Sequence, residues 1–173
     1  GGSSSERYRR KHREARAGPA SSIEGRVGHK VQYSKLVLLE KLPGSVNLLN
    51  LRTMENDSHP LRGRAGFFSE TDRPGVVLVG LERDLVLYDL RARQLIGKPF
   101  PVSTDERVVI NDGVAVSEGV LFGTKHTTFK ERIACMYLYA TATGRLHTLH
   151  SQQICANGKF LSDGSLVDID SPN

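Results

Sequence analysis

The apolar sequence VVLVG occupies residues 76–80, and related runs return as VLFG at 120–123 and as SLVD at 165–168. These copies are spaced by about 44 and then about 45 residues. The first two are each followed by a Leu-Tyr pair, at 87–88 and at 138–139. A repeat of about 40–50 residues with four short strands is typical of a propeller blade. The repetition therefore predicts a β-propeller, because a sandwich does not require it.

Other short apolar runs support an all-β fold. They are rich in Val, Leu, Tyr and Phe, are separated by Gly, Pro, Asp and Asn, and are too short for helices. Because only 6% of the residues are aromatic and none is Trp, the core is expected to consist mainly of Val, Leu and Ile. The predicted strands comprise residues 36–40, 46–51, 65–69, 76–81, 85–90, 107–110, 120–124, 136–140, 146–149 and 166–169.

Residues 27–173 are assigned to a partial propeller. About three blades of the observed repeat length fit into this segment. Known propellers need at least four blades, so this chain is expected either to be a piece that stops before a ring closes, which we favour, or to complete a ring by association. Open edges would then promote self-association of the protein.

Residues 1–26 have a different composition and are predicted to be a disordered basic leader. They consist largely of Gly, Ser, Arg and Lys and carry too little apolar surface to fold. The first 16 residues hold six basic and two acidic side chains, which accounts for most of the net charge of +5. The rest of the chain is almost neutral, so nucleic-acid binding is not expected of its folded part.

The sequence gives no sign of a membrane or secretory protein. It lacks an apolar run of about 18 residues and a signal-peptide pattern, so we expect a soluble protein, with the cytoplasm as the favoured compartment. Cys135 and Cys155 form no CxxC pair and are predicted to be free thiols in strands.

Two short polar segments stand out from the repeats. Asn111-Asp112-Gly113 and Asn157-Gly158 each lie where one predicted blade leads to the next inner strand, beside the central channel. An Asn carbonyl is a neutral oxygen donor that suits Ca²⁺, Mg²⁺ or Mn²⁺ and tolerates Zn²⁺. The same dipeptides also form ordinary hairpin turns, and spacing alone favours the turns.

The stretch from about residue 107 to 170 resembles the SMP-30/gluconolactonase/LRE family, also called regucalcin-like. Members of that family are six-bladed propellers. The order and spacing of several short segments carry the resemblance. These segments are INDG at 110–113, LFGT at 121–124, YLY at 137–139, TG at 143–144, ICANG at 154–158 and DGSL at 163–166.

The resemblance implies a site and a reaction. By position, Asn157 matches a metal-binding Asn of the family and Asn111 matches an Asn that contacts substrate. Asp112, beside it, is the candidate catalytic acid or base. One divalent cation (Ca²⁺, Zn²⁺, Mn²⁺ or Mg²⁺) would polarise the carbonyl of a small-molecule lactone and favour its hydrolysis. The expected activity is therefore that of a metal-dependent hydrolase of sugar lactones or similar cyclic esters.

The departures from the family pattern limit this expectation. Residues 27–60 lack the Gly-Glu segment that supplies the first metal carboxylate, and the second carboxylate would lie beyond Asn173. Val109 stands where an Arg often precedes the Asn-Asp-Gly segment. Only one of the usual three metal ligands is visible, so we expect the chain alone to be a weak catalyst or none. The alternative is a non-catalytic propeller that binds protein partners.

Overall fold

The computed structural model describes residues 35–41 and 44–171, and for residues 35–40 it describes the backbone. The predicted leader at 1–26 lies outside the described residues. Every regular element of the described part is a β-strand, and a helix with the length and apolarity that a bilayer requires does not occur there.

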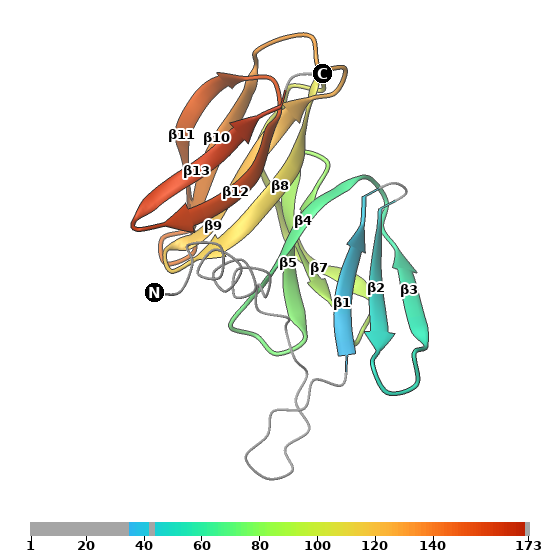
Figure 1. Ribbon diagram of the computed structural model, residues 1–173. Coiled ribbons are helices and arrows are strands. Elements are labelled where there is room, and N and C mark those ends of the chain that lie inside the picture. The colour runs from blue at the N-terminus through green and yellow to red at the C-terminus, as the bar shows by residue number, and fades with distance from the viewer. Residues whose placement is uncertain (1–34, 42–43, 172–173) are drawn as a thin grey trace, which may run out of the picture.

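Thirteen strands in the described residues form four antiparallel sheets (Figure 1). The first sheet contains β1 (Lys35–Glu40), β2 (Ser45–Asn50) and β3 (Asn56–Pro60). The second contains β4 (Ala65–Glu70), β5 (Val76–Leu81), β6 (Asp84–Asp89) and β7 (Gln94–Pro101). The third contains β8 (Val108–Val116), β9 (Gly119–His126), β10 (Ala134–Ala140) and β11 (Arg145–Gln153). A fourth sheet pairs β12 (Ala156–Ser162) with β13 (Ser165–Asp170).

Each of the three larger sheets is a meander in which consecutive strands are neighbours. The first strands of successive sheets also contact one another, β1 with β4, β4 with β8, and β8 with β12. Sheets that meet through their first strands are blades arranged around an axis, and β4, β8 and β12 are the innermost strands. The described residues thus form three blades and the beginning of a fourth, which confirms the prediction of a partial propeller.

The position of the innermost strands corrects one detail of the sequence analysis. The polar segments at 111–113 and 157–158 were expected just before the next inner strand, which would make the apolar runs that follow them inner strands. VLFG lies instead on β9, and VVLVG lies on β5, both of them second strands. A second strand has neighbours on both edges and other blades over both faces, and all six residues of β5 are buried. The most apolar run of each repeat therefore marks the second strand. Asn111 and Asn157 lie on the innermost strands themselves.

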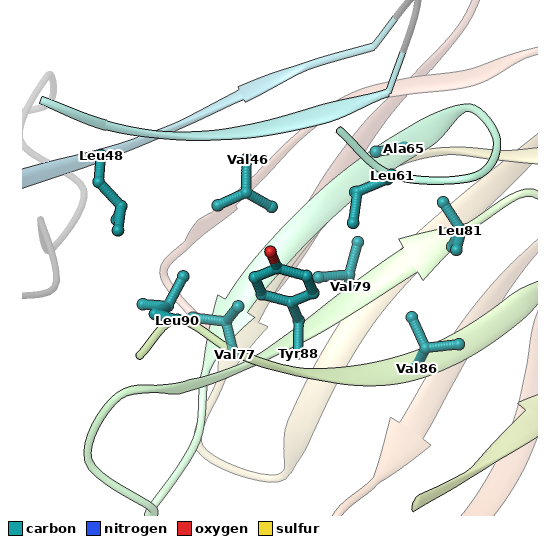
Figure 2. Packing of buried hydrophobic residues seen from close by; sticks show 10 residues of the cluster. All are labelled: Val46, Leu48, Leu61, Ala65, Val77, Val79, Leu81, Val86, Tyr88 and Leu90. Atoms are coloured by element: carbon teal, nitrogen blue, oxygen red, sulfur yellow. The ribbon is translucent and has the colours of Figure 1, made fainter. Parts of the chain in front are cut away.

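Two apolar layers hold the blades together. Figure 2 shows the first layer, where Val46 and Leu48 of β2 face Val77, Val79 and Tyr88 of β5 and β6. The second layer joins the second and third blades around two aromatic contacts. The ring centroids of Phe67 and Phe122 are 5.5 Å apart, and those of Phe122 and Tyr137 are 5.4 Å apart. These layers fix the innermost strands relative to one another.

The last sheet differs from the others in its exposed apolar surface. Phe160 and Leu161 of β12 and Val167 and Ile169 of β13 are all exposed. Self-association through open strand edges would involve such a surface. Self-association itself stays a prediction. Cys135 and Cys155 are free thiols, Cys155 being buried.

Candidate active site

Both predicted Asn residues lie at irregularities of innermost strands. Ile110 pairs with Thr124 and Asp112 with Gly123, so Asn111 is an extra residue in β8. The register of β12 against β13 likewise shifts between Asn157 and Phe160. Such β-bulges re-aim side chains and are common beside active sites. The hairpin-turn alternative is therefore wrong for both segments.

Gly158 shows why the second bulge needs its glycine. Its φ of 56° lies in the left-handed region, which most residues with a side chain avoid. The bulge turns the Gly158 N–H toward β8, where it donates to Asp112 Oδ2 at 2.9 Å. The two bulges are thus joined directly, and Asp112 lies beside the segment that carries Asn157.

Asn111 is buried, with 5% of its surface exposed, and its polar atoms are engaged. Its Nδ2 donates to the carbonyl oxygen of Ala156 at 3.2 Å and to Cys155 Sγ at 3.4 Å. Its Oδ1 accepts a hydrogen bond from Arg64 Nη2 at 2.8 Å. The Asn111 side chain therefore joins residues from three successive blades. Its role in substrate contact stays a prediction, and Arg64 is the cationic donor beside it.

Arg64 is one of the residues that sequence reasoning missed. It precedes β4, and its Nη1 donates to the carbonyl oxygen of Ile110. The backbone N–H of Arg64 donates to the side-chain Oε1 of Glu82. The backbone oxygen of Glu82 accepts a hydrogen bond from the N–H of Ile110. Burial lowers the pKa of Arg64, although Glu82 opposes the shift. An arginine remains charged under all ordinary conditions, so this contact brings a guanidinium to Asn111.

Val109 and Arg64 occupy the same place in successive blades. In each blade, the last paired residue before the bulge is Ile110 (with Thr124) or Ala65 (with Leu81). Val109 and Arg64 are the residues immediately before these two. Val109 is buried in the core. A guanidinium therefore does contact Asn111, but it comes from Arg64 of the preceding blade and not from position 109. The 45-residue repeat was the only sequence signal that could have indicated it.

Two lysines add positive charge to this end of the innermost strands. Lys41 Nζ donates to the backbone oxygen of Asn111 at 2.9 Å. Part of Lys41 is exposed, but burial of the rest lowers the pKa of its ammonium, and Arg64 lowers it further. Lys125 of β9 forms a backbone bridge with Cys155 and holds its ammonium 4.4 Å from the ring centroid of Phe129. Burial, then Arg64, lowers the pKa of Lys125.

The residues around Asn157 do not by themselves fit a divalent cation. Such ions bind through several oxygen ligands, of which carboxylates are the most important. One carboxylate, that of Asp112, contacts the Asn157 bulge, and Lys41 and Arg64 make the surroundings positive. Residues 35–41 and 44–171 hold no group of three His, Cys, Asp or Glu side chains arranged for a metal ion. Asn157 as a metal ligand stays a prediction.

Comparison with solved structures gives the fold of known relatives. The chain is similar to a luciferin-regenerating enzyme, with 17% identity and a TM-score of 0.67, over 80% of this chain and 49% of that one. It is also similar to regucalcin from Agrobacterium tumefaciens, described as a calcium-binding protein, with 18% identity and a TM-score of 0.69, over 79% of this chain and 46% of that one. Both are six-bladed propellers, and this chain spans about half their length.

Comparison with protein families gives the membership. No curated protein matches the sequence. The family model of the SMP-30/gluconolactonase/LRE-like region matches residues 24–172, which include every strand described above. The chain therefore belongs to the SMP-30/gluconolactonase/LRE-like family.

Proposed function

We propose that this protein is a lactonase-like hydrolase that opens a sugar lactone or a similar cyclic ester. The observation that carries the proposal is the polar bulge of β8, where Asn111 contacts Arg64 and Asp112 contacts the Asn157 bulge. A polar group of this kind on adjacent innermost strands lies where propellers of this family would bind a small molecule. Family membership supports the reaction class.

The groups at the bulge suit the two charge changes of lactone hydrolysis. Attack of water on the carbonyl carbon forms a carbon–oxygen bond and leaves negative charge on the carbonyl oxygen. A guanidinium held in place before the reaction can stabilise that charge, and Arg64 is fixed by its bonds to Ile110 and Asn111. The ring carbon–oxygen bond then breaks, and the ring oxygen takes up a proton to give a hydroxy acid.

Asp112 is the proposed general base. Its Oδ2 is held by the Gly158 N–H, while Oδ1 makes no hydrogen bond within the described residues. A carboxylate fixed through one oxygen can accept the proton of the attacking water through the other. Because Asn157 and Asp112 do not complete a divalent-cation site, the proposed steps involve only side chains of this chain. For the same reason we expect the rate of this chain alone to be low.

Asp112→Asn tests the proposal. The substitution preserves size and an acceptor for Gly158 but removes the base, so we expect hydrolysis of gluconolactone to fall about 10²-fold or more. The measurement is proton release from gluconolactone at high protein concentration, with and without added Ca²⁺, Mn²⁺ or Zn²⁺. Asp163→Asn, at the exposed turn between β12 and β13, is the matched control and should not change the rate.

Two results would overturn parts of this proposal. Hydrolysis that persists unchanged in Asp112→Asn would remove Asp112 from the mechanism. Hydrolysis no faster than the uncatalysed reaction under every metal condition would exclude lactonase activity for this chain and favour the non-catalytic scaffold.

A further inference from the structure

Three cationic side chains lie close enough at the same end of the innermost strands to shift one another's pKa, and none of them forms an ion pair with a carboxylate of the described residues. Lys41, Arg64 and Lys125 are here called the cationic cluster. The ion pairs within the described residues involve other basic groups: His59, Arg93, Arg107, His126, Arg132 and Lys159. The three cations of the cluster are thus uncompensated by direct ion pairing in the part of the chain that the structure describes.

The cationic side chains of the cluster make their hydrogen bonds and ring contact with neutral groups. Lys41 donates to the backbone oxygen of Asn111, and Arg64 donates to Oδ1 of the same residue and to the carbonyl oxygen of Ile110. Lys125 lies over an aromatic ring. Carbonyl oxygens and a ring face orient a cation but do not neutralise it. An anion that enters this end of the strands would therefore meet fixed positive charge.

The nearest carboxylates are already held by backbone N–H groups. Asp112 accepts from Gly158, and Glu82 accepts from the N–H of Arg64. Burial lowers the pKa of both lysines, and Arg64 lowers each further. Asp112 opposes the shift of Lys41, and Glu82 opposes that of Arg64, so two carboxylates face three partly buried cations and leave an unfavourable excess of positive charge. A bound anion relieves this cost, because charge-assisted hydrogen bonds to carboxylate or phosphate are the strongest available to Lys and Arg.

We propose that the cationic cluster binds a carboxylate or phosphate group of a small-molecule ligand. This inference rests on the proposed function for its consequence. The preferred lactones carry an additional anionic group, which Lys41 and Lys125 recognise while Arg64 faces the reacting carbonyl oxygen and Asp112 acts at the ring. The chemistry common to these ligands is a compact, polyhydroxylated molecule with one anionic group besides the reacting ester.

Calorimetric binding to the full chain at low ionic strength tests the proposal without turnover. The probes are 6-phosphogluconate, gluconate and inorganic phosphate, with glucose as the neutral sugar. We expect 6-phosphogluconate to bind most tightly, glucose to give no measurable heat, and affinity to fall steeply with added salt. Inorganic phosphate that binds as tightly as 6-phosphogluconate would assign the site to a free anion and overturn recognition of a sugar ligand.

Substitutions within the cluster locate the binding. We expect Lys41→Gln and Lys125→Gln each to weaken 6-phosphogluconate binding about tenfold, as loss of one charged hydrogen bond does. Lys125→Arg, which retains the charge, should retain most of the affinity. Lys98→Gln, an exposed lysine of β7, is the matched control and should not change it. Unchanged affinity in both cluster variants, with the fold verified by circular dichroism, would overturn the site.

The experiments can contradict the anion site without contradicting the lactonase activity, and the lactonase activity without contradicting the anion site. Anion binding that depends on Lys41 and Lys125, in a chain that hydrolyses no lactone, would confirm the site and contradict the proposed reaction. Hydrolysis of neutral gluconolactone that requires Asp112, in a chain that binds no anion, would support the proposed reaction and contradict the anion site.

Discussion

The sheets β4–β7 and β8–β11 share one plan and one irregularity but differ in the residues placed there. The register of β4 against β5 shifts between Ala65 and Phe67, so Gly66 is the extra residue. The register of β8 against β9 shifts at the equivalent point, and Asn111 is the extra residue there. The residue that follows each bulge is Phe67 in one blade and Asp112 in the other.

This difference separates packing from chemistry. A side chain at Gly66 would meet the backbone oxygen of Ile110 at 2.6 Å, so glycine there lets β4 approach β8 closely. Phe67 lies against Gly80 and Gly113 and packs on Phe122. In the next blade the same positions carry an amide and a carboxylate that contact other blades through hydrogen bonds. The bulge is a shared framework, and the residue within it decides whether the blade packs or binds.

Phe67→Ala tests the role of the β4 bulge in packing and has the largest expected effect on stability. Truncating a buried aromatic residue costs about 3–5 kcal/mol, so the free energy of unfolding should fall by that amount. Asp112→Asn, at the equivalent position, should change it by less than about 1 kcal/mol. Urea denaturation measures both. Equal losses in the two variants would contradict the assignment of packing to one bulge and chemistry to the other.

The sequence predicted the framework better than the contacts across it. Strands such as β5 and β9 were predicted because their apolar runs recur. The list of predicted strands omitted β3, β7 and β12, because β3 is polar and the apolar residues of β7 and β12 are interrupted by Gly, Lys or Pro. The innermost strands were misplaced by one strand, since the most apolar run is buried on both faces rather than nearest the axis. Burial alone cannot distinguish these two positions in a sequence.

The site divides in the same way. Asn111, Asp112 and Asn157 were predicted because short motifs mark them, and the structure brings their segments together. Arg64 and Lys41 were not predicted, because they are 47 and 70 residues from Asn111 in the chain. Their contacts depend on how successive blades pack, which no local pattern records.

The connection into β12 offers a finer comparison with the connection into β8. Asp170 accepts the N–H groups of Ile154 and Cys155, both at 2.9 Å. Burial acts to raise the pKa of Asp170, but these bonds and Arg132 outweigh it, and the pKa lies below its ordinary value. A carboxyl whose pKa is lower in the folded protein stabilises the fold above its unfolded pKa, about 4, and loses this effect as pH falls through the folded pKa.

Asp170→Asn should therefore destabilise the protein in a pH-dependent way. We expect a loss of about 1–2 kcal/mol at pH 7, the size of one or two hydrogen bonds to a charged acceptor, shrinking toward zero in acid. Urea denaturation at pH 7 and pH 3 measures it. Asp105→Asn, in the exposed connection before β8, should have a smaller effect that persists to lower pH, because Arg107 lowers the pKa of Asp105 to about 2. A loss for Asp170→Asn that is equal at both pH values would contradict this assignment.

Asn111→Gly tests the central claim most directly, because it gives the bulge of β8 the residue that β4 has. The variant loses the hydrogen bonds to Arg64, Cys155 and Ala156, so we expect a folded protein that is about 2–3 kcal/mol less stable. The decisive measurement is gluconolactone hydrolysis together with 6-phosphogluconate binding by this variant. We expect both to fall at least about tenfold, because Arg64 loses the amide that orients it. A folded Asn111→Gly protein with unchanged hydrolysis and unchanged affinity would contradict the claim that this one polar residue makes the bulge a site.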